Sequence, residues 1–152
     1  MDDLVPMLIS LLLGTAVGWE RQIGRKPAGL RTHTLVCIGS TLFVLLGRHA
    51  LQLSPSQTYD PTRIIHGVVT GVGFLGAGAI IRREGMTHGL TTAASIWMAS
   101  AIGVAVGVRA YTLAAIGTVL ALIVLEVFRW MERAMAPKGG PRDKEPTAKG
   151  PG

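Results

Sequence analysis

Five uncharged, mostly apolar stretches follow one another along the chain. No Asp, Glu, Lys or Arg occurs at 4–19, 32–47, 64–81, 85–108 or 110–125. The shortest stretch has 16 residues and the longest 24, close to the roughly 20 apolar residues with which a helix crosses a bilayer. The pattern predicts an all-α, polytopic membrane protein with five transmembrane helices. We place these helices at about residues 4–19, 32–51, 61–81, 91–108 and 111–130.

The ends of several segments carry the residues expected there. Asp60-Pro61 combines an N-cap acceptor with a proline whose missing N–H would be unpaired at a helix start. Thr91 and Thr92 open the fourth helix. The first helix follows an acidic start at residues 1–3 instead of the basic region of a secretory signal, so we expect it to be uncleaved. Trp19 is expected at the membrane interface, where an indole keeps its N–H in water.

Composition supports a membrane domain followed by a different kind of segment. Hydrophobic residues make up 49% of the chain and charged residues 16%, with a mean hydropathy of +0.43. These values exclude an ordinary soluble domain and a disordered protein, and neither heptads nor a collagen repeat occurs. From Pro137 onward, the last sixteen residues hold four prolines and four glycines. We therefore predict a membrane domain at 1–133 and a disordered, cytoplasmic, Pro/Gly-rich tail at 134–152.

The basic residues predict the orientation. With five spans, alternate connections share a side, and twelve of the fifteen Lys and Arg residues then fall on one side. The positive-inside rule places the N-terminus outside and the C-terminus in the cytoplasm. The pI near 10.3 could also indicate a nucleic-acid partner. Because the charges punctuate apolar spans, orientation and lipid headgroups explain them better, and no nucleic-acid partner is predicted.

Glycine is abundant inside the apolar segments. Gly14/Gly18, Gly67/Gly71 and Gly103/Gly107 are each four residues apart, which puts both members on one helix face where another backbone can approach. The run 71–76 also spells the dinucleotide-binding fingerprint, but no strand precedes it and no acid follows at the required distance. Packing within the bundle is favoured over dimerisation. The glycines predicted to serve helix packing are Gly14, Gly18, Gly67, Gly71, Gly73, Gly76, Gly78, Gly103 and Gly107.

The sequence offers no signature of catalysis. Cys37 is the only cysteine, and the four histidines have no metal-ligand spacing. No catalytic triad, carboxylate pair or HExxH motif is present, and no acid lies in mid-span. We therefore expect no enzyme, metal or cofactor. The charged residues on the cytoplasmic side form either an anion or partner surface at helix ends or solvated ends that fix topology. His66 could respond to acid or be a hydrogen-bonded bystander.

Five strings together resemble one family. They are Gly14 with Gly18-Trp19-Glu20-Arg21-Gln22, Pro27-Ala28-Gly29-Leu30-Arg31-Thr32-His33, Asp60-Pro61-Thr62-Arg63-Ile64, Gly71-Val72-Gly73-Phe74-Leu75-Gly76-Ala77-Gly78, and Gly89-Leu90-Thr91-Thr92-Ala93-Ala94 with Trp97. In this order and at this spacing they resemble the N-terminal membrane domain of the MgtC/SapB family, over about residues 4–130.

The resemblance implies a small bacterial inner-membrane protein. For the MgtC branch it implies a role in survival at low Mg²⁺ and inside host cells, and restraint of the F-type ATP synthase through membrane contacts. Two departures favour a short SapB-like member over full-length MgtC. Thr91 and Met98 stand where MgtC has Asn and Cys, and the soluble C-terminal domain of longer members is replaced by the predicted tail.

From these observations we predict a non-enzymatic regulator in Mg²⁺ limitation, acid or envelope stress. The alternative is a small oligomeric ion or solute transporter, since five short helices enclose little aqueous volume. The partners considered are membrane lipids, a membrane complex such as the F-type ATP synthase, and further copies of the chain. The candidate functional residues, all polar groups at helix ends within the family strings, are Glu20, Arg31, Thr32, Asp60, Arg63 and Glu84.

Overall fold

The computed structural model describes residues 3–53, 60–83 and 85–135. Within these ranges the chain forms five helices and one short antiparallel hairpin. In chain order the elements are α1 (Leu4–Ile23), α2 (Leu30–Leu53), α3 (Pro61–Gly78), β1 (Ile81–Arg83), β2 (Met86–His88), α4 (Leu90–Gly107) and α5 (Tyr111–Met135). The all-α prediction is confirmed, whereas the hairpin was not predicted.

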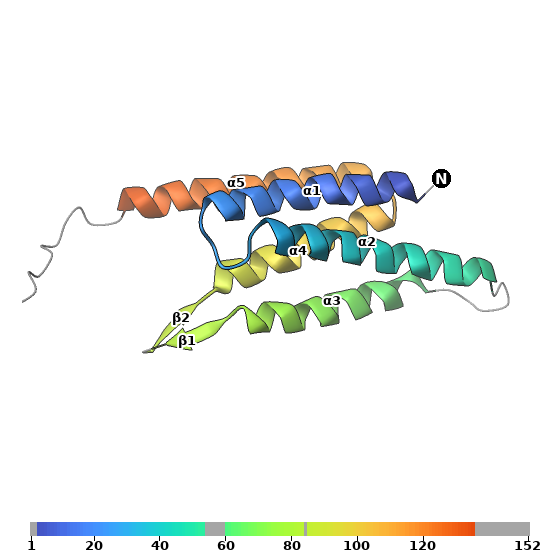
Figure 1. Ribbon diagram of the computed structural model, residues 1–152, viewed down its shortest axis with the longest axis horizontal. Helices are drawn as coiled ribbons and strands as arrows, with labels where there is room; N and C mark the ends of the chain where they lie inside the picture. The colour runs from blue at the N-terminus through green and yellow to red at the C-terminus, as the bar shows by residue number, and fades with distance from the viewer. Residues whose placement is uncertain (1–2, 54–59, 84, 136–152) are drawn as a thin grey trace, which may run out of the picture.

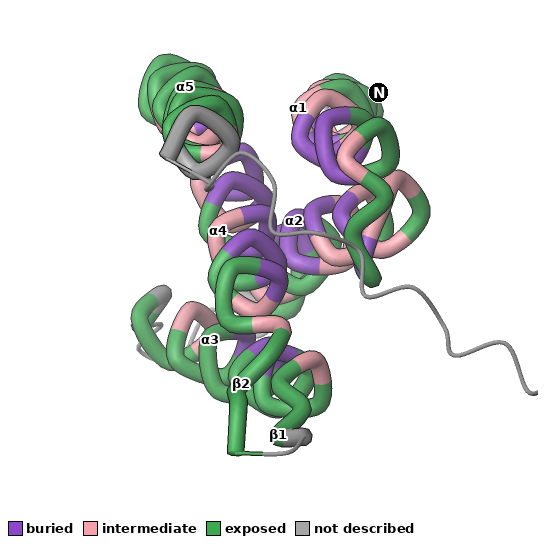
Figure 2. The backbone as a smooth tube through the Cα atoms, turned by 90° about the vertical axis from the view of Figure 1, so that its left-hand side faces the viewer, coloured by how far each residue is buried: buried purple, intermediate pink, exposed green. Residues whose placement is uncertain are grey.

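The helices lie along a common axis in three layers. Figure 1 shows α1 and α5 in the upper layer, α2 and α4 in the middle and α3 below, with consecutive helices running in alternate directions. The view along the axis in Figure 2 shows the same order. Helix α4 contacts each of the other four helices, and 56% of its apolar span is buried, against 17% for α5. The core is therefore centred on α4.

Helix α2 is held between two glycine faces. A Cβ atom added to Gly14 of α1 would lie 2.7 Å from Cys37 Cβ, and one added to Gly18 would lie 2.8 Å from Leu30 Cα. On the other side of α2, two glycines of α4 are equally close. A Cβ atom added to Gly103 would lie 2.2 Å from the carbonyl oxygen of Cys37, and one added to Gly107 would lie 2.6 Å from Val44 Cβ. Only hydrogen fits at such distances, so these glycines let α1 and α4 approach α2 closely.

Hydroxyl groups join α2 to α4 across this contact. Ser40 and Ser100 share a hydrogen bond of 2.8 Å. The Thr41 hydroxyl lies 2.7 Å from the carbonyl oxygen of Gly103, to which it donates. All three side chains are almost fully buried. A buried hydroxyl without a partner is costly in an apolar medium, so these bonds satisfy the polar groups of the spans within the bundle.

Helix α3 begins as predicted and ends earlier than predicted. Asp60 is its N-cap and accepts a hydrogen bond from the Thr62 N–H at 2.9 Å, and Pro61 occupies the first turn. The helix ends at Gly78, so the predicted limit at residue 81 is wrong: Ile81 already belongs to β1.

Two glycines in the left-handed region explain this early end. Gly85, in the turn of the hairpin, has φ 82°, and Gly89, which caps α4, has φ 89°. A Cβ on Gly89 would lie 2.0 Å from the carbonyl oxygen of Ala79. The return of the chain from α3 to α4 therefore needs glycine at position 89 for both its φ and its space.

The glycines of α3 are not in close contact with a neighbouring helix. Added Cβ atoms would meet nothing within 4 Å at four of them, and at Gly76 the nearest atoms lie at 3.7 Å, an ordinary contact. Within the described chain, Gly67, Gly71, Gly73 and Gly78 therefore have no close neighbour, and their packing role stays a prediction. Helix α3 is held instead by Val68 and Val72, which contact Ile96 and Ala28 in a small cluster of their own. The reason is placement, since α3 lies at the edge of the bundle.

The other helix limits differ from the prediction by a few residues. The first helix continues past residue 19 to Ile23, the second begins at residue 30 instead of 32, and the fifth extends to Met135. In the part of the chain that the structure describes, four helices are long and apolar enough to cross a membrane, namely Leu4–Ile23, Leu30–Ala50, Leu90–Gly107 and Tyr111–Met131. Helix α3 does not reach that level because Arg63 and His66 lie in its first turns.

Candidate functional site: a charged cluster at one end of the bundle

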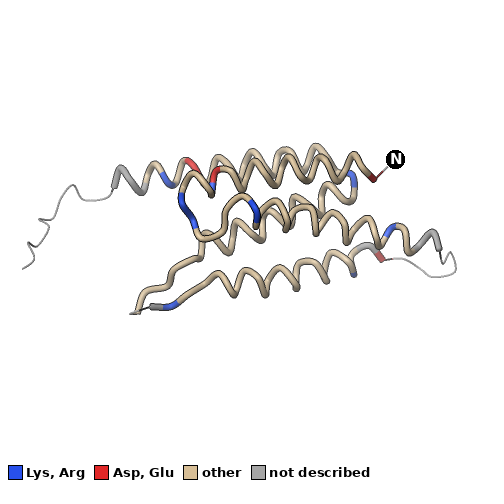
Figure 3. The backbone as a smooth tube through the Cα atoms, in the orientation of Figure 1, with Lys and Arg blue, Asp and Glu red and all other residues tan. Residues whose placement is uncertain are grey.

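Charged residues of the described chain gather at the two ends of the bundle, and the middle is free of them (Figure 3). One end carries the last turn of α1, the hairpin and the last turns of α5 (Figure 1). The other end carries the start of α1, the end of α2, the start of α3 and the turn before α5. The two ends hold separate groups of predicted residues.

Glu20 and Arg21 lie at the centre of a charged cluster at the end of the bundle where α1 ends. Both lie in the last turn of α1 and are buried, with 9% and 2% of their surfaces exposed. Arg21 Nη1 lies 3.6 Å from Glu20 Oε2, and Arg129 Nη1 from α5 lies 3.4 Å from Glu20 Oε1. The carboxylate is thus neutralised by two guanidinium groups, one of them more than a hundred residues away in sequence.

This cluster is paired in charge but incomplete in hydrogen bonds. Among the residues that the structure describes, neither oxygen of Glu20 nor Nε of Arg21 has a hydrogen-bond partner. Taking ions out of water is expensive, and the attraction between them offsets this cost only if the remaining polar atoms are also bonded. Arg129 does not supply the hydrogen bonds that Glu20 lacks, because its second nitrogen, Nη2, donates to Glu126 one turn earlier on α5. One guanidinium therefore serves two carboxylates.

A groove between α1 and α5 runs up to this cluster. Its volume is about 710 Å³. Its lining residues are Leu12, Thr15, Ala16, Trp19, Glu20, Ile23, Leu122, Glu126 and Arg129. Trp19 and Glu126 are exposed, at 59% and 58%, while Arg129 is 15% exposed. Apart from Thr15, the polar lining is confined to the charged end.

Behind the cluster, a buried histidine connects α2 to α4. His33 has no exposed surface. Its Nδ1 lies 2.8 Å from the Gly29 carbonyl oxygen, and its Nε2 lies 2.9 Å from Ser95 Oγ. Because a carbonyl oxygen only accepts, Nδ1 carries a proton. Ser95 Oγ also lies 2.8 Å from the Thr92 carbonyl oxygen, so its single proton serves either that carbonyl or an unprotonated Nε2.

The structure places the predicted residues in different surroundings. Glu20 belongs to the charged cluster. At the same end of the bundle, Arg31 is exposed and Thr32 half-buried at the start of α2. Asp60 and Arg63 lie at the opposite end, where Asp60 caps α3 and Arg63 is exposed. Hydrogen bonds from Thr62 hold the pKa of Asp60 below its usual value of 3.8. Glu84 lies outside the described residues, as does most of the predicted tail.

A second ion-pair group, at that opposite end, was not predicted. Asp3, just before α1, lies 2.5 Å from Arg48 Nη2 and 2.5 Å from His49 Nε2 at the end of α2, and 3.9 Å from Arg109 Nη2. The hydrogen bond from His49 is the main reason why the pKa of Asp3 is lowered. These contacts fasten the start of α1 to the neighbouring helices.

Sequence reasoning also missed several members of the first cluster. Arg21 and His33 were part of family strings, and none of Arg21, His33, Glu126 and Arg129 was among the candidate functional residues. The one available signal was that Glu126 and Arg129 lie three residues apart on a helix, the spacing of a local ion pair. Nothing in the sequence places Arg129 beside Glu20.

The described residues contain no group of three or more His, Cys, Asp or Glu side chains that could hold a metal ion. Two guanidinium groups lie within 3.6 Å of Glu20 and neutralise its carboxylate, which weakens its attraction for a divalent cation.

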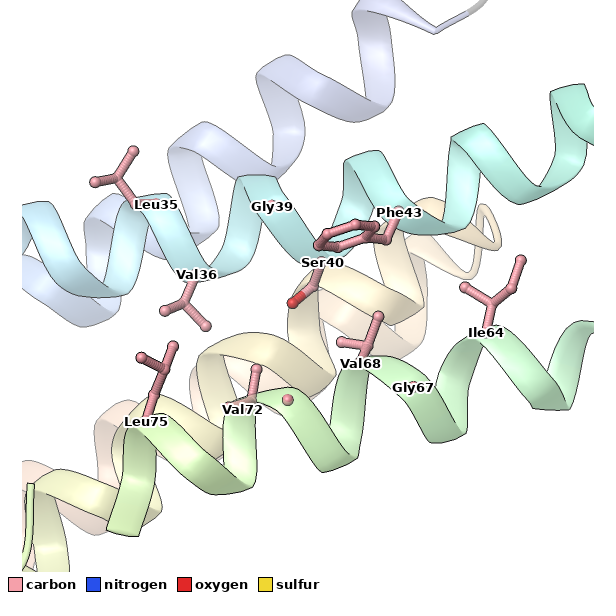
Figure 4. A pocket seen from close by; sticks show the side chains of 11 residues that line it. Leu35, Val36, Gly39, Ser40, Phe43, Ile64, Gly67, Val68, Val72 and Leu75 are labelled. Carbon is pink, nitrogen blue, oxygen red and sulfur yellow. The ribbon is translucent and has the colours of Figure 1, made fainter. Parts of the chain in front are cut away.

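A second cavity lies between α2 and α3 and has a different character. Its volume is about 660 Å³. In Figure 4, Val36, Ser40 and Phe43 of α2 face Val68 and Leu75 of α3 across it. Ser40 is its polar side chain, and that hydroxyl is already bonded to Ser100. Among the described residues that line this cavity, none has a charged side chain.

Comparison with known proteins gives one consistent result. The family model described as MgtC family matches residues 7–134. The chain is 44% identical over 130 residues to the putative magnesium transporter YhiD of Escherichia coli K12, a match covering 84% of this chain and 60% of YhiD. It is 34% identical over 140 residues to protein SapB of Bacillus subtilis, covering 90% and 60%. It is 39% identical over 120 residues to protein MgtC of Brucella abortus, covering 79% and 48%.

The chain spans about half to three fifths of the length of these three relatives. No solved structure gives a significant match. The family model covers most of the chain, including α1 with the charged cluster and the glycine faces. With its apolar helices, this makes the chain a membrane protein, and it belongs to the MgtC family.

Proposed function

We propose that this protein is a multi-pass protein of the bacterial inner membrane that acts in Mg²⁺ homeostasis as a non-enzymatic regulator. Family membership and the description of the relative YhiD as a putative magnesium transporter support the connection with Mg²⁺. The observation that carries the regulatory role is the charged cluster: its buried carboxylate, Glu20, is neutralised by Arg21 and Arg129. A path for Mg²⁺ needs oxygen ligands that are free to bind the ion.

The polar groups inside the spans support the same proposal. Ser40, Thr41, Ser95 and Ser100 are bonded to one another's helices or to backbone carbonyl oxygens. Such groups stabilise a bundle, and they offer a passing ion no ligand without breaking a bond that holds the helices together. A regulator would act through contacts of the folded bundle, under the stress conditions expected from the sequence.

Orientation is part of the proposal. Because consecutive helices alternate in direction, the connection after α1, the hairpin and the end of α5 lie at one end of the bundle (Figure 1). Most of the basic residues lie at that end or beyond it in the sequence. The positive-inside rule favours this end as the cytoplasmic one, with α3 as a fifth and less apolar span.

The alternative is a small oligomeric transporter, which the name of YhiD favours for that relative. A paired test separates the two functions. The full chain would be produced in a bacterium lacking its own copy and scored for growth at low Mg²⁺, and the purified chain would be placed in vesicles with an Mg²⁺-sensitive dye. We expect growth to be restored without Mg²⁺ flux. Saturable Mg²⁺ flux through the wild-type chain would refute the regulatory proposal.

Variants of the cluster sharpen this test. Glu20→Gln and Arg129→Gln each remove one charge of the α1–α5 pair, and Lys26→Gln removes one charge from the exposed loop after α1. We expect the first two to impair growth at low Mg²⁺ at normal protein levels, and the third to behave as wild type. Equal growth of all three would show that the cluster is not needed for the function.

A further inference from the structure

The α1–α5 groove has the polarity of a membrane lipid. Helices α1 and α5 run in the same direction (Figure 1), so their residues can be ordered by depth. Leu12, Ala16 and Leu122 line the part nearer the middle of the bundle, and Glu20 and Arg129 line the end. An apolar slot that becomes charged at its end fits an amphiphile lying along the bilayer normal, with its acyl chain deep and its headgroup at the interface.

The charged end carries both signs. Three ionisable side chains line it, the carboxylates of Glu20 and Glu126 and the guanidinium of Arg129. Arg21, the second cation beside Glu20, is 2% exposed and does not line the groove. The groove therefore presents two negative groups and one positive group. A purely anionic headgroup would meet two carboxylates, whereas a zwitterionic one can place each of its charges opposite its complement.

The carboxylate of the cluster lacks hydrogen-bond donors among the described residues. Both oxygens of Glu20, a side chain nine-tenths buried, have no donor among the described residues. The nitrogen atoms of Arg129 are divided between Glu20 and Glu126. A primary ammonium group supplies three N–H donors and a second positive charge, while a phosphate accepts bidentate bonds from a guanidinium. A trimethylammonium group has no N–H to donate.

We propose that the groove between α1 and α5 binds one phospholipid with a zwitterionic, primary-ammonium headgroup, of the phosphatidylethanolamine type. Its phosphate bonds Arg129, and its ammonium bonds the exposed carboxylate of Glu126. The oxygens of Glu20, each with less than 1 Å² of accessible surface, lie behind this contact and add their negative charge to it. One acyl chain fills the slot beside Ala16. The exposed Trp19 lies against the headgroup, where its ring face favours a cation. This proposal does not depend on the role in Mg²⁺ homeostasis.

Retention of lipid by the purified full chain tests the proposal. The chain in detergent would be mixed with equal amounts of phosphatidylethanolamine, phosphatidylcholine and phosphatidylglycerol that carry the same acyl chains. Native mass spectrometry then counts the bound lipids. We expect one retained lipid per chain and a preference of about fivefold for phosphatidylethanolamine, which corresponds to about 1 kcal/mol.

Four variants separate the parts of the site. Glu126→Gln, at a side chain that is 58% exposed, folds without difficulty and should bring phosphatidylethanolamine and phosphatidylcholine to parity. Arg129→Gln should weaken all three phospholipids, because each has a phosphate. Ala16→Leu should reduce retention whatever the headgroup, because it fills the slot. Lys26→Gln, which changes one charge outside the groove, should bind lipid as wild type does.

Several results would overturn the proposal. Equal retention of the three lipids by the wild-type chain would mean that the groove holds acyl chains without reading the headgroup. A preference for phosphatidylglycerol would mean that the exposed basic loops select the lipid. An unchanged preference of Glu126→Gln for phosphatidylethanolamine would mean that the carboxylates do not recognise the headgroup. A dimer that excludes lipid from the groove would identify a second copy as its occupant.

Discussion

The contact between α2 and α4 can be tested by a single methyl group at Gly103. In Gly103→Ala the added carbon would lie 2.2 Å from the carbonyl oxygen of Cys37 and 2.9 Å from Ser40 Cβ. Contacts below 3.0 Å do not occur for real Cβ atoms. The nearer atom belongs to the backbone and cannot rotate away. The two helices must therefore separate locally by about 1 Å to reach van der Waals distance.

The cost follows from the contacts that this separation weakens. Overpacking a tight interface costs about 1–3 kcal/mol. Separation also stretches the bonds from Thr41 to the Gly103 carbonyl oxygen and between Ser40 and Ser100, and a hydrogen bond between membrane helices contributes about 0.6–2 kcal/mol. We expect Gly103→Ala to lose about 2–4 kcal/mol, a large part of the stability of a domain of this size.

Thermal unfolding in detergent, followed by far-ultraviolet circular dichroism, would measure this loss. The matched control is Gly71→Ala in α3, where an added Cβ meets nothing within 4 Å. The control should melt at or slightly above the wild-type temperature, because alanine favours helix more than glycine does by about 1 kcal/mol. If Gly103→Ala melted at the same temperature as Gly71→Ala, α2 and α4 would not be in backbone contact and the reasoning would be refuted.

Three further results are expected. A reporter fused after Gly152 should be cytoplasmic and one inserted near Ser56 external, as judged by enzymatic reporters in cells, and both on one side would contradict the five-span orientation. The hydrogen bond from His49 lowers the pKa of Asp3 in the folded protein. The ionised Asp3 therefore stabilises the fold at a pH above the pKa that it has in the unfolded chain, and this stabilisation is lost as the pH falls through its pKa in the folded protein. Melting temperatures of Asp3→Asn and wild type should accordingly differ at neutral pH and converge below about pH 3.8, and a constant difference would exclude this linkage. His33→Phe keeps a ring but removes both buried hydrogen bonds, so it should lower the unfolding free energy by about 1–3 kcal/mol, and an unchanged melting curve would contradict that role.

The sequence predicted the features that depend on neighbouring residues. The apolar stretches located all five helices to within a few residues, and Asp60-Pro61 correctly marked the start of α3. These signals are local, since a cap or an apolar turn acts within a few residues of itself. The end of α3 was missed because residues 79–81 are as apolar as a helix interior. The φ values of Gly85 and Gly89 decide the hairpin there instead.

The features that depend on the arrangement of helices could not be predicted in the same way. Gly67/Gly71 and Gly103/Gly107 have the same spacing, yet the first pair lines the cavity between α2 and α3 with no neighbour within 4 Å, whereas the second is in close contact with α2. The difference is the distance at which each helix lies from α2. Glu20 was among the candidates, but its partner on α5 is fixed by the approach of two helices far apart in sequence, which no local pattern records.

The position of Cys37 between two glycines has a thermodynamic consequence. Gly14 and Gly103 belong to different helices, and both press on this one residue of α2 from different sides. If one glycine is enlarged, α2 can relieve the crowding by moving toward the other helix. If both are enlarged, α2 has no direction left in which to move. The two sites are therefore coupled through a third, and because residues that share a packing partner do not act independently, we expect the penalty of the double substitution to exceed the sum of the two single penalties.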